Sequence, residues 1–139
     1  MCRTIASLII VLLCCYVSKG QSLHDYRWKN RLVFIVNPHI DQHGGHPQIK
    51  AFEGYTKAVQ ERDVLVYVLR KNKVFDLDGL IVNWTGKTVP YSSFKGIVLI
   101  GKDGSIKLKK PFLVSAKEIF DLIDSMPMRR AEMKDSVKD

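Results

Sequence analysis

Residues 32–36 read LVFIV and residues 64–70 read VLVYVLR. Continuous apolar runs of this length are typical of strands that are buried on both faces of a sheet. A polar loop at residues 37–46 follows the first run, and we expect a helix over residues 47–62 with Pro47 in its first turn. Two strands joined by a helix predict a β-α-β unit with parallel strands. The apolar side chains that recur at helical spacing are Ile49, Phe52, Tyr55 and Val59.

A β-hairpin is predicted in the second half of the chain. GIVLI at residues 96–100 is a third apolar strand, antiparallel to SIKLK at residues 105–109. The Asp-Gly pair within residues 101–104 favours the tight turn that joins them. The second strand alternates in polarity, so its apolar and basic side chains are expected on opposite faces, with Phe112 and Ile106 as anchors to the core. The apolar members are Ile106 and Leu108, and the basic members are Lys107 and Lys109.

A final helix is predicted after a capping box, SAKE at residues 115–118, and Pro127 ends it. The polar tail after about residue 128 is expected to fray, and residues 71–94 read as a loop with at most one short element. The order β-α-β, hairpin and helix predicts one α/β domain over residues 21–139, with a thioredoxin-like sheet of about four strands. The core side of the helix would carry Ile119, Phe120, Leu122, Ile123 and Met126.

The N-terminus has the pattern of a secretory signal peptide. Arg3 precedes an apolar run from Ile5 to Val17, and small residues stand before a predicted cleavage site after Gly20. The alternative is an N-terminal membrane anchor, but the run is short for a membrane span and no other segment approaches the length needed. Cleavage would remove all three cysteines, Cys2, Cys14 and Cys15. We therefore expect a secreted protein, with no membrane span after cleavage and no thiol chemistry.

The charge of the predicted mature chain favours acidic partners. Arg3 and Lys19 leave with the signal peptide and no acid does, so the net charge of +8 becomes +6. A basic extracellular domain attracts sulfated polysaccharides and acidic proteins, and secretion excludes nuclear nucleic acid as a target. The sequence leaves the partner, the oligomeric state and the biological process open.

Three stretches resemble a known family: WKNRLVFIV at residues 28–36, LIGKDGSIKLKKP at residues 99–111 and FDLIDSMPMRRAEM at residues 120–133. They are similar to the extracellular domain of unknown function 4174, which ends the sushi-repeat-containing secreted proteins and repeats in the matrix protein equarin. The resemblance implies a peroxiredoxin-like or thioredoxin-like fold and an extracellular-matrix or cell-surface binding role. It supplies no established catalytic residues, and this chain lacks sushi repeats.

The residues that carry chemistry in a thioredoxin-like fold are absent from the expected place. Residues 37–48, between the first strand and the first helix, hold no cysteine, and the thiolate is the nucleophile in thiol-disulfide chemistry. The sequence also lacks a nucleophile elbow, a phosphate-cradling glycine motif and a zinc-protease HExxH motif. We therefore expect a protein that is not an enzyme and needs no cofactor.

A histidine loop offers the alternative, an enzyme that uses a metal or the imidazoles directly. Its ligand types suit Zn or Cu, but their spacing matches no metal motif, so we expect no tight metal site. A polar loop whose histidines hydrogen-bond or face water explains the same residues. The residues concerned are His39, Asp41, His43 and His46 within residues 39–46.

Three basic clusters are candidates for binding heparin-like glycosaminoglycans. Cations held in a row along a strand can follow a sulfated chain, although lysines on a sheet edge also serve simply to prevent aggregation. Asn83-Trp84-Thr85 fits the acceptor pattern for N-glycosylation, with an unmodified loop as the alternative. The clusters are Arg27, Lys29 and Arg31; Arg70, Lys71 and Lys73; and Lys102, Lys107, Lys109 and Lys110.

Overall fold

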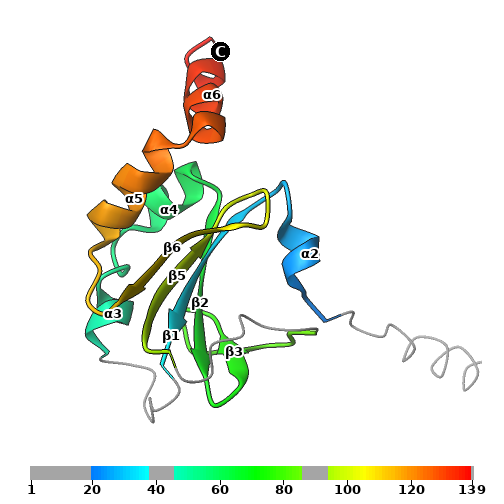
Figure 1. Cartoon of the computed structure of the whole chain (residues 1–139), viewed down its shortest axis with the longest axis vertical. Coiled ribbons are helices and arrows are strands. Elements are labelled where there is room, and N and C mark those ends of the chain that lie inside the picture. Colours follow the sequence, from blue (N-terminus) through cyan, green and yellow to red (C-terminus); the bar gives the residue numbers. More distant parts are fainter. Residues whose placement is uncertain (1–19, 38–45, 86–93, 139) are drawn as a thin grey trace, which may run out of the picture.

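Strand β1, Arg31–Val36, runs through the middle of the sheet, and all six of its residues are buried. In the computed structural model, which describes residues 20–37, 46–85 and 94–138, the chain forms one mixed α/β domain (Figure 1). The predicted signal peptide lies outside the described residues except for Gly20. Among the described residues, no helix has the length and apolar character needed to cross a membrane.

Two strands flank β1, and the predicted parallel pairing with the first of them is confirmed. Strand β2, Val64–Arg70, is parallel to β1, and strand β5, Gly96–Ile100, is antiparallel to it. Strand β6, Ile106–Pro111, pairs with β5 in antiparallel fashion and forms one edge. The expectation of about four strands was too low, because β3, Lys73–Phe75, and β4, Ile81–Val82, extend the other edge from the unassigned segment. The order across the six-stranded sheet is β4-β3-β2-β1-β5-β6.

The two faces of the sheet are covered differently (Figure 1). Helices α3, Pro47–Lys50, α4, Thr56–Glu61, and α5, Ala116–Ser125, cover one face, where Ile49, Phe52, Ile119, Phe120 and Ile123 join the buried strand residues. The short helix α2, Leu23–Tyr26, packs against the other face together with Trp84 and Phe94. Alternate residues of β1 therefore enter two apolar clusters, which explains its continuous apolar run.

The single helix expected over residues 47–62 is wrong in one respect, because the chain forms α3 and α4 with a turn between them. Gly54 lies in that turn at φ +83°, a left-handed conformation that ends a helix and that glycine adopts without strain. Ile49 and Phe52 are buried as expected, whereas Tyr55 is exposed. The hydrophobic pattern is continuous over this segment, but the helix is interrupted.

The expected alternation along β6 is also wrong. Leu99 is opposite Leu108, but Ile100 is opposite Ile106, so Lys107 is an extra residue in a β-bulge. Pairing with β5 places Leu108 and Lys110 on the helix-covered face and Ile106 and Lys109 on the other. Ile106 is exposed and does not anchor the hairpin, whereas Phe112 packs against the core as predicted.

The C-terminal tail is helical rather than frayed. Helix α5 begins at the predicted Ser115 cap and ends at Ser125. Pro127 ends α5 as expected, but it also occupies the first turn of a further helix, α6, Pro127–Ser136. Helix α6 projects beyond the sheet end and buries none of its residues (Figure 1). Polar contacts to the sheet end hold it.

Candidate functional site

The structure sorts the predicted basic residues between the two ends of the sheet. Because β1 and β2 are parallel, residues before β1 and residues after β2 lie at opposite ends, separated by strands roughly 20 Å long. We name these the paired end and the basic end. The paired end carries Arg27, Lys29, Arg31, Lys102 and Lys107, and the basic end, with the second half of β6, carries Arg70, Lys71, Lys73, Lys109 and Lys110.

The sequence places Arg31 in an exposed basic cluster, and this prediction is wrong because Arg31 is a buried cation. Its side chain is 1% exposed and donates to both carboxylate oxygens of Glu132 on α6, each at 3.2 Å, and to the carbonyl of Arg62 at 2.8 Å. A guanidinium can be buried at the start of a strand only when such acceptors surround it. Glu132 therefore supplies the charge that Arg31 requires.

Lys102 is the second predicted surface cation that turns inward. Its side chain is 10% exposed, and its Nζ donates to Glu132 and to Asp63, both at 2.7 Å. Burial alone would raise the pKa of the Glu132 carboxyl, but hydrogen bonds from Lys102 and Arg31 outweigh burial and hold that pKa below its ordinary value. The carboxylate of Glu132 thus joins α6 to β1 and to the hairpin turn.

A neighbouring set of ion pairs fastens the junction of α5 and α6. Asp124 accepts two hydrogen bonds from Arg62, at 3.0 and 2.6 Å, and one from Arg129 at 3.2 Å. Arg129 also donates to the carbonyl of Glu61. Burial raises the pKa of Asp124, but the bonds from Arg62 and Arg129 lower it by more, so the net shift is downward. Ion pairs of the Glu132 and Asp124 carboxylates therefore hold α6 in place, rather than burial of apolar side chains.

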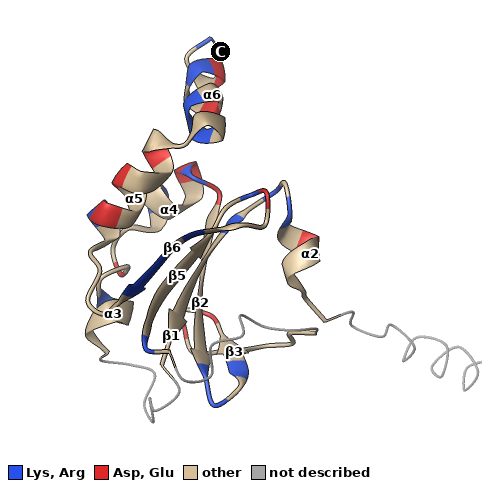
Figure 2. Cartoon of the chain, in the orientation of Figure 1, with Lys and Arg blue, Asp and Glu red and all other residues tan. Residues whose placement is uncertain are grey.

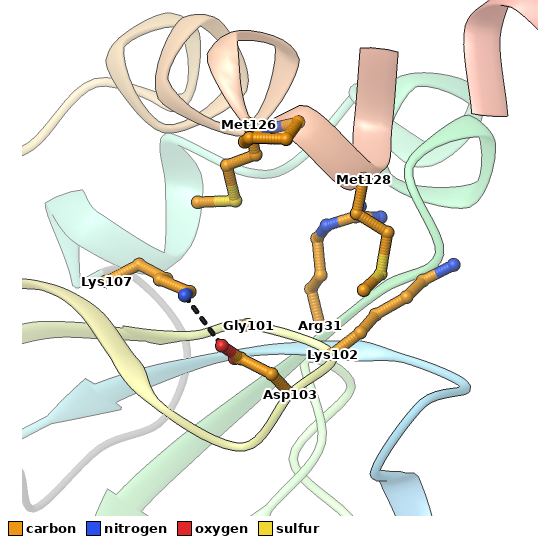
Figure 3. Close-up of a pocket in the computed structure, with 8 residues that line it drawn as sticks. Arg31, Gly101, Lys102, Asp103, Lys107, Met126 and Met128 are labelled. Atoms are coloured by element: carbon orange, nitrogen blue, oxygen red, sulfur yellow. Dashed lines mark hydrogen bonds and ion pairs between the residues drawn. The ribbon is translucent and has the colours of Figure 1, made fainter. Parts of the chain in front are cut away.

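A pocket of about 300 Å³, which we name the methionine pocket, lies beside this network (Figure 3). Met126 and Met128 extend into it from the α5–α6 junction, while Arg31, Lys102 and Lys107 approach from the sheet. Lys107 reaches the pocket because of the bulge and pairs there with Asp103 at 2.8 Å. The lining consists of Arg31, Gly101, Lys102, Asp103, Lys107, Met126, Pro127 and Met128.

Asp103 is held by more than its lysine. Its carboxylate also accepts hydrogen bonds from the backbone N–H and the hydroxyl of Ser105, at 3.1 and 2.9 Å. The bond from Lys107, followed by that from the Ser105 backbone, lowers the pKa of Asp103 to about 2. Asp103 is therefore ionised at physiological pH and forms part of the hairpin turn itself.

The basic end has a different character. Figure 2 shows Lys and Arg residues along β6 and around the β2–β3 turn. The guanidinium of Arg70 lies over the ring of Phe75 at 4.0 Å, and the Nζ of Lys109 lies over the ring of Phe94 at 4.7 Å. Lys110 pairs with Glu118 on α5 at 2.6 Å. Aromatic rings thus position two of the cations here, and two strands, β2 and β1, separate β3 from β5.

The acceptor asparagine lies on the outer side of its segment. Asn83 is exposed, whereas Trp84 packs against Tyr26, Phe34 and Tyr67, with ring centroids 5.5 to 5.8 Å apart. Trp84 and Gln21 form an isolated parallel bridge. The bulky middle residue of the acceptor pattern therefore faces the core and leaves Asn83 accessible.

The histidine loop lies largely outside the described residues, which include His46 but not His39, Asp41 or His43. The Nδ1 of His46 accepts from the backbone N–H of Gln48 and caps α3, its Nε2 lies 3.3 Å from Asn37, and burial lowers its pKa. Both ring nitrogens thus have local partners. Within the described part of the chain, no cluster of three His, Cys, Asp or Glu residues is arranged to hold a metal ion.

Sequence reasoning missed the residues that build the paired end. Glu132 lies 101 positions from Arg31, Asp63 lies 39 positions from Lys102, and Asp124 lies 62 positions from Arg62. One signal was available, because Arg31 directly precedes an apolar run and Glu132 is a lone acid in the basic stretch MRRAEMK. Such a pattern indicates a long-range ion pair only once the fold is known.

Comparison with protein families matches residues 22–132 to the model of a domain of unknown function, DUF4174. The matched region includes the whole sheet and ends at Glu132, the residue that α6 contributes to Arg31. No solved structure matches the chain.

Proposed function

The chain belongs to the DUF4174 family, and we propose that within it this protein is a secreted, non-enzymatic binding module of the extracellular matrix or cell surface that recognises sulfated glycosaminoglycans through the basic end of its sheet. The observation that carries the proposal is the position of five predicted cations there: Arg70, Lys71, Lys73, Lys109 and Lys110. We also propose that this chain is related to the sushi-repeat-containing proteins and to equarin, as its sequence resemblance implies.

The geometry of the basic end suits an extended polyanion. From β3 to β6 the sheet crosses four inter-strand steps, so the cations spread over about 20 Å. Stacking of Arg70 on Phe75 and of Lys109 on Phe94 restricts these long side chains before any ligand arrives. Cations ordered in advance lose less entropy on binding, which supports recognition of a sulfated chain.

A thioredoxin-like scaffold is part of the proposal. The order β2-β1-β5-β6, with β1 and β2 parallel and β5 and β6 antiparallel, supports it, and β3 and β4 would be an addition at one edge. Residues 37–48 lack cysteine, so the scaffold would display side chains rather than perform thiol chemistry. The structural role of His46 as a helix cap gives no support to an enzyme that uses the histidine loop.

Heparin affinity chromatography of the mature protein tests the proposal. Removing two cations from the basic end, in Lys71→Ala/Lys73→Ala, should lower the salt concentration needed for elution. By the counterion-release argument, the slope of log affinity against log salt should fall by roughly two units.

The matched control removes two exposed cations from the paired end, in Arg27→Ala/Lys29→Ala. Both variants lose the same charge, so a general charge effect moves them equally. Equal shifts, or release of the wild type near physiological salt, would contradict a specific surface at the basic end.

A further inference from the structure

We propose that the methionine pocket is a binding site for a small amphiphilic carboxylate, whose apolar chain packs against Met126 and Met128 and whose carboxylate binds Lys107. The site lies at the paired end, so it is separate from the proposed polyanion surface, and either proposal can fail without the other.

The apolar wall of the methionine pocket is suited to a flexible chain. Met126 packs against the main core cluster, and Met128 is 40% exposed beside it. Thioether side chains are polarizable and rotate easily, so they adapt to ligands of different shape. A volume of about 300 Å³, with an apolar wall and few polar groups, is at the small end of the range for small-molecule sites.

The opposite wall offers a ligand one accessible cation. Three cations, Arg31, Lys102 and Lys107, line the methionine pocket against one acid, Asp103. Glu132 and Asp63 balance the charges of Arg31 and Lys102, so neither of these cations is available to a ligand. Lys107 is therefore the cation that contacts the ligand.

Exchange of Asp103 for a ligand carboxylate costs little. The Lys107–Asp103 pair is partly exposed, with side chains 34% and 36% accessible, and pairs of this kind contribute little stability. Asp103 keeps the two hydrogen bonds from Ser105 after Lys107 leaves it. Lys107 can thus turn to a bound anion while the Asp103 carboxylate keeps its hydrogen bonds from Ser105.

Gly101 keeps the floor of the methionine pocket open. A Cβ at this position would lie 2.6 Å from the Cε of Lys107 and 2.8 Å from Oδ1 of Asp103, so a side chain here would displace both groups. Glycine at 101 therefore leaves Lys107 room to move between Asp103 and a ligand.

Methyl NMR of the protein carrying ¹³C-labelled methionine methyl groups tests the site directly. Titration with octanoate should shift the methyl signals of Met126 and Met128. Met133 lines a separate surface pocket on α6 with Arg130 and Lys134 and does not line the methionine pocket, so it is the internal control for binding elsewhere. Octanamide, which keeps the chain but not the charge, and acetate, which keeps the charge but not the chain, should each bind at least about tenfold more weakly, since each lacks one of the two contacts.

Variants separate the pocket from general charge effects. Lys107→Ala should weaken octanoate binding about tenfold, the contribution of one charge-assisted hydrogen bond. Lys117→Ala removes another lysine paired with an acid four residues away, outside the methionine pocket, and should leave binding unchanged. Equal affinity for octanoate and octanamide, equal effects of the two variants, shifts of Met133 like those of Met126, or no shifts at all would each overturn the proposal.

Discussion

Gln48 is a buried polar side chain that joins α3 to the segment before α5. It is fully buried, and its amide donates to the carbonyl of Val114 at 2.6 Å and accepts from the Val114 N–H at 2.8 Å. The two bonds satisfy both backbone groups of a residue that is itself buried in the core. One side chain therefore closes a contact across 66 residues of sequence.

Replacement of Gln48 by leucine should destabilise the protein by about 3 kcal/mol, because both Val114 groups would remain buried without partners. Urea unfolding of the mature protein measures the change. Gln60→Leu, at an exposed position on α4, is the matched control and should change stability by less than about 0.5 kcal/mol. A Gln48→Leu variant as stable as this control would show that the bridge is dispensable.

At the residue scale, the charge of a side chain is a poor predictor of whether that side chain is exposed. Arg31 and Lys102 were grouped with exposed cations because Lys and Arg are rarely buried, yet their long-range carboxylate partners permit burial. Lys71 and Lys73 are exposed as such residues usually are. The difference depends on Glu132 and Asp63, whose proximity no local pattern reveals.

Helix α6 shows how an element with little apolar surface can be positioned by charge. It buries no residue, and Glu132 and Arg129 make its contacts to the sheet end and α4. The helix should therefore respond to conditions that change charge, while the apolar core should not.

Acid should release the stabilisation that Glu132 supplies. Its folded-state pKa is lowered, so the stabilisation is fully present above the unfolded-state pKa and is lost as pH falls through the lowered one. Glu132→Gln should cost about 2 kcal/mol at neutral pH, by analogy with other buried charged hydrogen bonds, and progressively less in acid. Urea unfolding over a pH series measures the difference, which should disappear at the acid end.

Asp135→Asn on the same helix removes a charge that is exposed, and it is the control for α6. It should leave stability within about 0.5 kcal/mol of wild type at neutral pH. If the cost of Glu132→Gln were independent of pH, or matched by Asp135→Asn, the ion pairs would not be what holds α6.

At the element scale, the sequence predicts the buried strands, but it does not predict the backbone irregularities or the short edge strands. The runs at β1, β2 and β5 are apolar throughout because both faces of those strands are buried, and this signal is local. The bulge at Lys107 and the break at Gly54 are single-residue backbone features within regular patterns. Strands β3 and β4 are too short to produce a period.

At the scale of the whole molecule, the two ends of the sheet offer different chemistry. The paired end holds its buried and pocket-lining cations with acids and contains the methionine pocket, while at the basic end Arg70 and Lys109 lie over aromatic rings. The proposed functions follow this division. It could not be read from three basic clusters in sequence, because strand order decides which of them meet.

Secretion of the whole chain should leave a glycan on Asn83, which is exposed while Trp84 faces inward. The secreted protein should lose mass when treated with an N-glycosidase. Asn83→Gln should be secreted at the lower mass and be unaffected by the enzyme. Wild-type protein recovered from the medium with no change in mass on treatment would contradict the assignment.

The pair between Arg31 and Glu132 also bears on when the domain can fold. The two residues are 101 positions apart, and Arg31 belongs to the central strand. During synthesis β1, β2 and β5 leave the ribosome before α6 does, so the sheet begins to assemble around a guanidinium whose carboxylate has not yet emerged. Completion of the core therefore waits for α6, and a nascent chain that stops short of Glu132 must keep Arg31 hydrated or leave its central strand incompletely packed.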